Sequence, residues 1–175
     1  MLEKGYVHIY TGNGKGKTSA ALGLAFRAAG SGLRSVIIQF MKGLPTGEME
    51  AASAFGGAIA IEQFGSMRFC LPNDATIEEH RMLARKGYDR AVEVLRESRY
   101  DIVVLDEVIT AISFSLLSVD EIVSLIEARP PRIELILTGR GATQRLIDYA
   151  DLVTEMKEVK HYYYKGVSPR RGIED

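Results

Sequence analysis

The sequence contains no tryptophan, one cysteine and no long apolar segment. Cys70 has no second cysteine with which to form a disulfide within the chain, and one thiol cannot supply a cysteine-rich zinc site. No apolar run approaches the ~20 residues that a membrane-spanning helix needs, and residues 1–5 lack the apolar core of a secretion signal. These absences argue against disulfide scaffolds and membrane proteins, and they predict a location in the reducing cytoplasm.

The charge is almost balanced, which argues against a protein that binds nucleic acid. The chain has 22 Lys and Arg residues against 23 Asp and Glu residues. Proteins that bind the phosphate backbone of nucleic acids normally carry a clear positive excess. The hydrophobic content of 46% is ordinary for a globular protein, and 175 residues are about the length of one domain, so we expect residues 1–175 to form one folded domain.

Apolar strands alternate with helical segments along the whole chain. We predict strands at 7–10, 35–40, 59–64, 101–106, 133–138 and 152–156. We predict helices at 17–29, 76–97, 119–128 and 142–149, with a short Ala-rich helix after a loop at 43–47. This alternation predicts an α/β fold in which a mostly parallel sheet carries helices on both faces.

A glycine-rich segment follows the first strand and opens the first helix. Glycines let the backbone approach a ligand closely, and the N–H groups at a helix start bind anions. Lys17 adds a positive charge for phosphate oxygens, and the Thr18 hydroxyl is suited to ligate magnesium. Thr11 occupies the place of the usual first glycine of a P-loop, so the loop is a shortened variant. We predict that this segment binds phosphate through Gly12, Asn13, Gly14, Lys15, Gly16, Lys17, Thr18 and Ser19; the alternative is a glycine-rich turn without a ligand.

Charged residues also follow three other predicted strands, and the carboxyl ends of parallel strands form a ligand crevice. Asp106 is predicted to hold magnesium, and Glu107 to orient water or to bind metal or substrate. The alternative for both is a favourable acidic start to a helix. Arg140 either reaches a phosphate or a partner subunit, or is a solvated charge in a turn. Lys42 is the fourth charged candidate at this edge.

The chain has three histidines, and their neighbours in the sequence predict a different position for each. His8 is predicted to pack within its strand, and His80 to lie on the surface of a charged helix. His161 belongs to a dense aromatic and basic run in the polar tail, from residue 157 to 175. This run either contributes to a site or closes the sheet as a further strand.

Several of these segments together resemble the P-loop corrinoid adenosyltransferases, which act on cob(I)alamin and cob(I)yrinic acid a,c-diamide. The tail carries the most specific part of the resemblance, which extends from Gly5 to Glu174. The segments that carry it are the phosphate loop, 39–43, Asp106-Glu107, 137–140, 150–156, Lys160-His161, Gly166 and Arg171-Gly172-Ile173-Glu174.

The resemblance implies a single-domain P-loop NTPase architecture of the RecA-like type and a group transfer. The 5′-deoxyadenosyl group of ATP moves to the cobalt(I) of a reduced corrinoid, and triphosphate leaves intact. Because cobalt(I) is the nucleophile, no nucleophilic side chain is expected, and Lys17 and Glu107 position the reactants and stabilise the transition state. A P-loop ATPase, a small-molecule kinase and a non-catalytic nucleotide-binding regulator are the alternatives.

The resemblance also implies ligands and partners. It assigns Arg140 and the phosphate-loop residues to ATP, and Thr18, Asp106 and Glu107 to Mg²⁺. Lys42, Phe69 and His161 are the expected corrinoid contacts. Phe69 lies in the segment equivalent to a Phe-Thr-Trp segment of many members, where it either wedges under the corrinoid or packs in the core. A homodimer and an electron-transfer reductase that supplies cobalt(I) are the expected partners.

Overall fold

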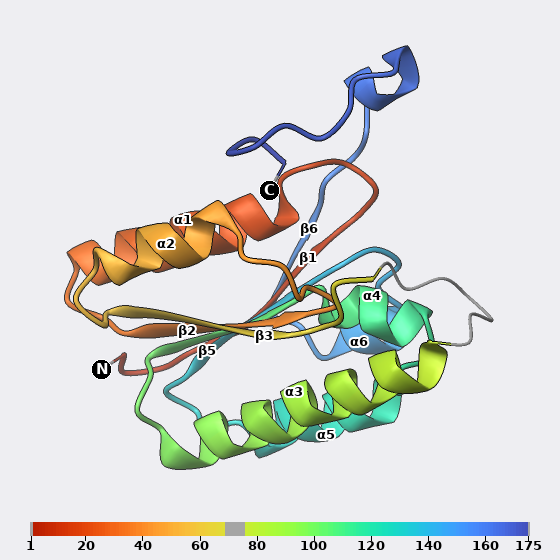
Figure 1. The fold of residues 1–175 in the computed structure, drawn as a ribbon. Coiled ribbons are helices and arrows are strands. Elements are labelled where there is room, and N and C mark those ends of the chain that lie inside the picture. Colours follow the sequence, from red (N-terminus) through yellow and green to blue (C-terminus); the bar gives the residue numbers. More distant parts are fainter. Residues whose placement is uncertain (1, 69–75, 175) are drawn as a thin grey trace.

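A six-stranded sheet runs through the part of the chain that the computed structural model describes, residues 2–68 and 76–174 (Figure 1). The strands are β1 (Val7–Thr11), β2 (Ser35–Phe40), β3 (Ile59–Phe64), β4 (Ile102–Asp106), β5 (Glu134–Thr138) and β6 (Leu152–Glu155). They lie in the order β3-β2-β4-β5-β1-β6, and each neighbouring pair is parallel. The parallel sheet confirms the predicted fold and brings the carboxyl ends of the strands to one edge.

Helices cover both faces of this sheet (Figure 1). One face carries α1 (Lys17–Gly30) and α2 (Gly47–Ser53). The other face carries α3 (Ile77–Glu97), α4 (Val108–Ser113), α5 (Val119–Ala128) and α6 (Gln144–Asp148). The sequence did not predict α4, because six mostly apolar residues directly after a strand are too few to display a helical period.

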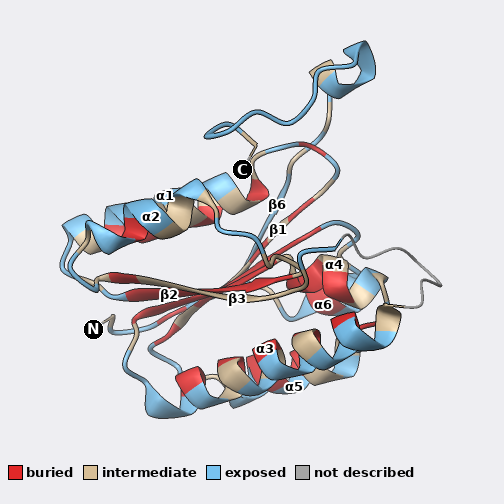
Figure 2. Cartoon of the chain, in the orientation of Figure 1, coloured by how far each residue is buried: buried red, intermediate tan, exposed pale blue. Residues whose placement is uncertain are grey.

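Side chains of the central strands alternate between two cores. In β4, Val103 and Leu105 join the core under α3 and α5, whereas Ile102 and Val104 join the core under α1. Successive side chains of a strand point to opposite faces, so a strand that is covered on both sides is apolar throughout. Figure 2 shows the result as buried strands between helices that are exposed on their outer surfaces.

His80 is buried, with 3% of its surface exposed, so the prediction of a surface position was wrong. It belongs to a helical stripe with Ala84, Gly87 and Ala91, all of which are also buried. The spacing of four, three and four residues places them on one face of α3. The other members of this stripe are small residues, which give only a weak apolar signal. The many charged residues around them therefore made this part of α3 look exposed in the sequence.

The tail forms no closing strand among the described residues. It forms instead a short 3₁₀ helix, η1 (Tyr162–Lys165), and then turns back toward the start of α1 (Figure 1). Its last described residues thereby line the same cavity as the phosphate loop. None of the helices within residues 2–68 and 76–174 is long and apolar enough to cross a membrane.

Candidate functional site at the carboxyl ends of the strands

A cavity of about 660 Å³ lies at the carboxyl ends of the strands. This volume is typical of sites for small molecules, roughly 300–1,000 Å³. Its walls include residues 13–19 of the phosphate loop together with Lys42, Glu107, Arg140 and His161, so most of the predicted site residues meet here. The sequence did not predict three further parts of the wall: Leu22 of α1, the first two residues of α2, and residues 172–174 of the tail.

The phosphate loop packs against the chain just after β6. Gly14 donates its N–H to the carbonyl oxygen of Met156 over 2.7 Å. A Cβ atom on Gly12 or Gly14 would lie 2.5 or 2.7 Å from that same oxygen. Gly16 has a φ of 117°, a left-handed conformation that side chains disfavour, where the loop enters α1. Glycines are therefore required here both by this close backbone contact and by the turn into the helix.

Lys17 closes the phosphate loop upon itself. Its ammonium donates to the carbonyl oxygens of Gly12 and Gly14, each over 2.8 Å, and only 6% of the residue is exposed. Burial lowers the pKa of Lys17, and the positive charge of Arg140 lowers it further, although Glu107 and Asp106 oppose both effects. An anion in the cavity would therefore meet a partly desolvated cation, whose attraction is stronger than it would be in water.

Asp106 is the buried centre of the site, with 0% of its surface exposed. Its Oδ1 accepts hydrogen bonds from the hydroxyls of Thr18, over 2.8 Å, and Thr138, over 2.7 Å. Its Oδ2 accepts from Lys42 over 3.1 Å and from Gln39 over 3.3 Å. The structure thus brings together Thr18 and Asp106, two of the three residues that the sequence proposed for magnesium; the third, Glu107, directly follows Asp106.

This donor set fits a magnesium ion that is shared with a nucleotide. Mg²⁺ prefers oxygen ligands and is usually held by one or two protein groups, with substrate phosphates and water completing its shell. Throughout the described ranges, no three His, Cys, Asp or Glu residues gather in a way that would hold a metal without help. Thr18 and Asp106 would accordingly need phosphate oxygens to complete the site.

Lys42 lies between two carboxylates. Its ammonium is 3.1 Å from Asp106 and 3.5 Å from Glu48 of α2. Burial alone would lower the pKa of Lys42, but Asp106 and then Glu48 outweigh it, so the pKa is raised and the ammonium stays charged. Gln39 donates to Glu48 over 3.1 Å and accepts from Gln63 over the same distance. A glutamine inside the apolar β2 was the one signal in the sequence for this network.

Glu107 and Arg140 are joined through Thr110 of α4. The Thr110 hydroxyl donates to the carboxylate of Glu107 and accepts the backbone N–H of Arg140 over 3.0 Å. Glu107 has a φ of 62°, and its own N–H donates to the Thr138 hydroxyl over 2.9 Å. These contacts place the end of β4 beside the turn after β5, and both charged residues line the cavity.

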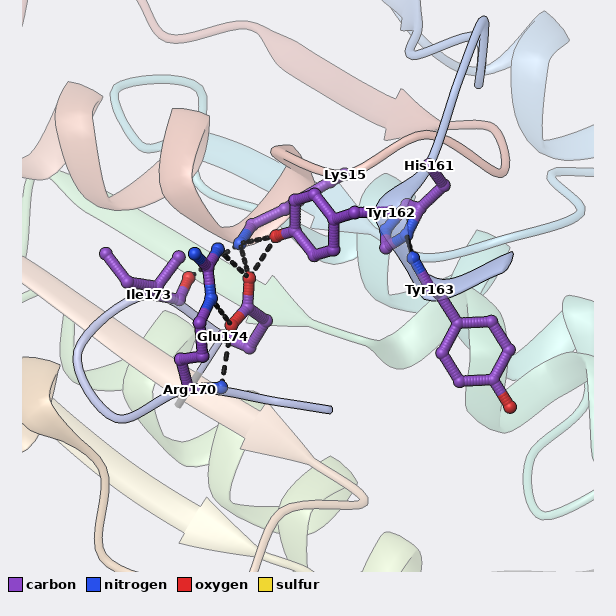
Figure 3. Close-up of polar contacts among 7 residues, drawn as sticks. All are labelled: Lys15, His161, Tyr162, Tyr163, Arg170, Ile173 and Glu174. Carbon is purple, nitrogen blue, oxygen red and sulfur yellow. Dashed lines mark hydrogen bonds and ion pairs between the residues drawn. The ribbon is translucent and has the colours of Figure 1, made fainter. Parts of the chain in front are cut away.

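Lys15 points to the tail (Figure 3). Its ammonium donates to a Glu174 carboxylate oxygen over 2.9 Å, to the Ile173 carbonyl over 2.7 Å and to the Tyr162 hydroxyl over 3.2 Å. His161 lines the cavity and caps η1, where its Nδ1 accepts the N–H of Tyr163 over 3.0 Å. Phe69, the remaining predicted contact, lies outside the described residues.

The chain resembles one family of enzymes over nearly its whole length. It matches the family model "ATP:corrinoid adenosyltransferase BtuR/CobO/CobP" over residues 3–174. A corrinoid adenosyltransferase of Sinorhizobium is 35% identical over 179 residues, which cover 98% of this chain and 81% of that protein. The corrinoid adenosyltransferase of Escherichia coli K12 and the corrinoid adenosyltransferase CobA of Salmonella typhimurium are each 34% identical over 173 residues, covering 98% of this chain and 86% of each relative. The family match therefore includes the phosphate loop, the strand ends and nearly all of the tail.

Proposed function

The chain belongs to the ATP:corrinoid adenosyltransferase family, and from this premise we propose how its cavity serves the reaction. The protein is a transferase that moves the adenosyl group of ATP to a corrinoid. The triphosphate of ATP binds between the phosphate loop and the end of β4. The observation that carries this placement is the hydrogen bond from Thr18, which lines that cavity, to the buried carboxylate of Asp106 behind it.

The residues of the cavity act on the leaving group. As cobalt(I) supplies an electron pair to C5′ of ATP, the C5′–O bond breaks and its electrons depart with triphosphate. Lys17, Arg140 and the N–H groups at the start of α1 stabilise the charge that develops on the triphosphate. Glu107 positions the reactants through the Thr110 contact that links it to the Arg140 turn.

Thr18 and Asp106 would hold Mg²⁺ beside the phosphates, where the ion would supply positive charge to the triphosphate. We assign Glu107 to this site as well, since it directly follows Asp106 and lines the cavity. The ion pair of Lys42 with Asp106 supports a place for Lys42 on the phosphate side of the cavity. His161 and Phe69 are kept as the proposed corrinoid contacts, with Lys42 at the border between the two substrates.

Three further proposals concern the protein in its cell. We place it in the cytoplasm, as a homodimer, with a separate electron-transfer reductase that supplies cobalt(I). The lone cysteine supports the first proposal, and the family resemblance supports the other two.

Adenosyl transfer can be observed directly. We expect that protein, Mg²⁺, ATP and chemically reduced cobalamin together give the absorption spectrum of a carbon–cobalt bond, with one triphosphate released for each bond formed. The matched control omits the reductant, so that cobalt(I) is absent. Release of orthophosphate without a change in the corrinoid would instead indicate an ATPase, and ADP with a phosphorylated product would indicate a kinase.

A further inference from the structure

Two contacts from later parts of the chain hold the phosphate loop, one just after β6 and one in the tail. Just after β6, the carbonyl of Met156 accepts the N–H of Gly14. The chain then forms η1 and returns, and Glu174 contacts Lys15 across 159 positions of sequence. Figure 3 shows this second contact, in which Tyr162 and Arg170 also point to the Glu174 carboxylate.

The second contact uses all the hydrogen-bonding capacity of Lys15. A lysine ammonium has three donors, and the Lys15 ammonium has three acceptors: the Glu174 carboxylate, the Ile173 carbonyl and the Tyr162 hydroxyl. In this arrangement no donor is left for a phosphate oxygen. Lys15 therefore differs from Lys17, two residues later, whose ammonium donates to the carbonyls of Gly12 and Gly14 within the loop itself.

Glu174 is equally committed to this cluster. One carboxylate oxygen accepts hydrogen bonds from the Lys15 ammonium, the Tyr162 hydroxyl and the Arg170 guanidinium. The other oxygen accepts the backbone N–H of Arg170 over 2.7 Å. The side chain is 16% exposed. Hydrogen bonds from Arg170, Tyr162 and Lys15 hold the pKa of Glu174 far below its usual range. The carboxylate is consequently charged at any pH at which the enzyme is expected to work.

We propose that Glu174 is a positioning residue for ATP, and that it acts by fixing the tail to Lys15. This inference rests on the proposed placement of ATP in the cavity, because Gly172, Ile173 and Glu174 form one wall of that cavity. With the contact in place, the tail encloses the nucleotide and the phosphate loop is held in its binding shape. Lys15 then serves the tail and leaves the phosphates to Lys17 and the loop N–H groups.

A competing arrangement makes the opposite prediction. If Glu174 merely occupied Lys15 until ATP displaced it, then removing the carboxylate would free the ammonium for phosphate and tighten ATP binding. If Glu174 positions the tail, removing it loosens one wall and weakens ATP binding. The sign of the change in the dissociation constant for ATP therefore decides between them.

The test measures ATP binding by calorimetry without corrinoid, on wild type, Glu174→Gln, Lys15→Met and the double variant. We expect each single variant to raise the dissociation constant roughly ten-fold, the effect of losing one charge-assisted hydrogen bond, and the double variant to add little. With saturating ATP and cob(I)alamin, kcat should stay within about two-fold of wild type, because the contact acts through binding. Lys165→Met, at an exposed lysine of the same tail, is the matched control and should change nothing.

Each other outcome overturns the positioning role. Tighter ATP binding by Glu174→Gln would establish displacement, and a far larger loss for Lys15→Met than for Glu174→Gln would make Lys15 a phosphate ligand. Unchanged ATP binding in both variants would show that the contact between Lys15 and Glu174 does not position ATP. Melting temperatures distinguish these effects from unfolding. Because ATP binding is measured without corrinoid, a wild-type protein that binds ATP but transfers nothing would count against the proposed function alone.

Discussion

Lys17→Ala is expected to lower kcat/KM for adenosyl transfer by roughly 100- to 1,000-fold, the usual effect of removing one preorganised group that stabilises developing charge. The Lys17 ammonium lies in the wall of the cavity and is desolvated by burial. Triphosphate gains negative charge as it leaves, and a buried cation stabilises that charge more than an exposed cation would. The measurement is steady-state adenosylation of cob(I)alamin over a range of ATP concentrations.

Two controls separate this role from a structural one. The Lys17 ammonium also bridges the carbonyls of Gly12 and Gly14, so its loss removes two contacts within the loop. Lys17→Arg keeps the charge but cannot reproduce the compact geometry of an ammonium, and it should recover only part of the activity. Normal activity with normal ATP affinity in Lys17→Ala would show that the loop does not bind the triphosphate.

The sheet and most of the site could be predicted because they depend on local patterns. The apolar run of β4 indicated a strand covered on both faces, and its position before Asp106 indicated a ligand edge. The order of residues in the phosphate loop likewise determined where Lys17 and Thr18 would lie. Such features are encoded within about ten consecutive residues, so they are visible without a structure.

The missed features depend on partners that no local pattern identifies. Nothing in the sequence pairs Lys15 with a residue outside its own loop, and in the structure Lys15 contacts Glu174. Glu48 directly follows the predicted loop at 43–47, and nothing in the sequence pairs it with Lys42, from which it lies 3.5 Å in the structure. In both cases an ion pair joins two segments that the path of the chain around the sheet brings together. The charge of a residue does not by itself show which residue of opposite charge it will contact.

Asp106→Asn is expected to raise the Mg²⁺ concentration needed for half-maximal activity by about ten-fold and to lower kcat by roughly 100-fold, as losses of charge-assisted contacts at a reacting site commonly do. The change removes one negative charge and preserves the shape of the side chain. The amide oxygen can still accept from Lys42, and the amide nitrogen can donate to the hydroxyls of Thr18 and Thr138, which accept as well as donate. The fold should therefore survive, while the oxygen that faces Thr18 is lost as a metal ligand.

The assay titrates Mg²⁺ at fixed ATP and cob(I)alamin, and a melting temperature is taken for each protein. Asp148→Asn, at an exposed position on α6, is the matched control for the same chemical change. A magnesium titration that coincides with that of wild type would reduce Asp106 to a structural residue that orders the ends of β2, β4 and β5 through its buried hydrogen bonds. A shifted titration with an unchanged melting temperature would instead support a magnesium ion bound beside Thr18. Because the Lys42 ammonium is present in both wild type and Asp106→Asn, the shift would be due to Asp106 and not to Lys42.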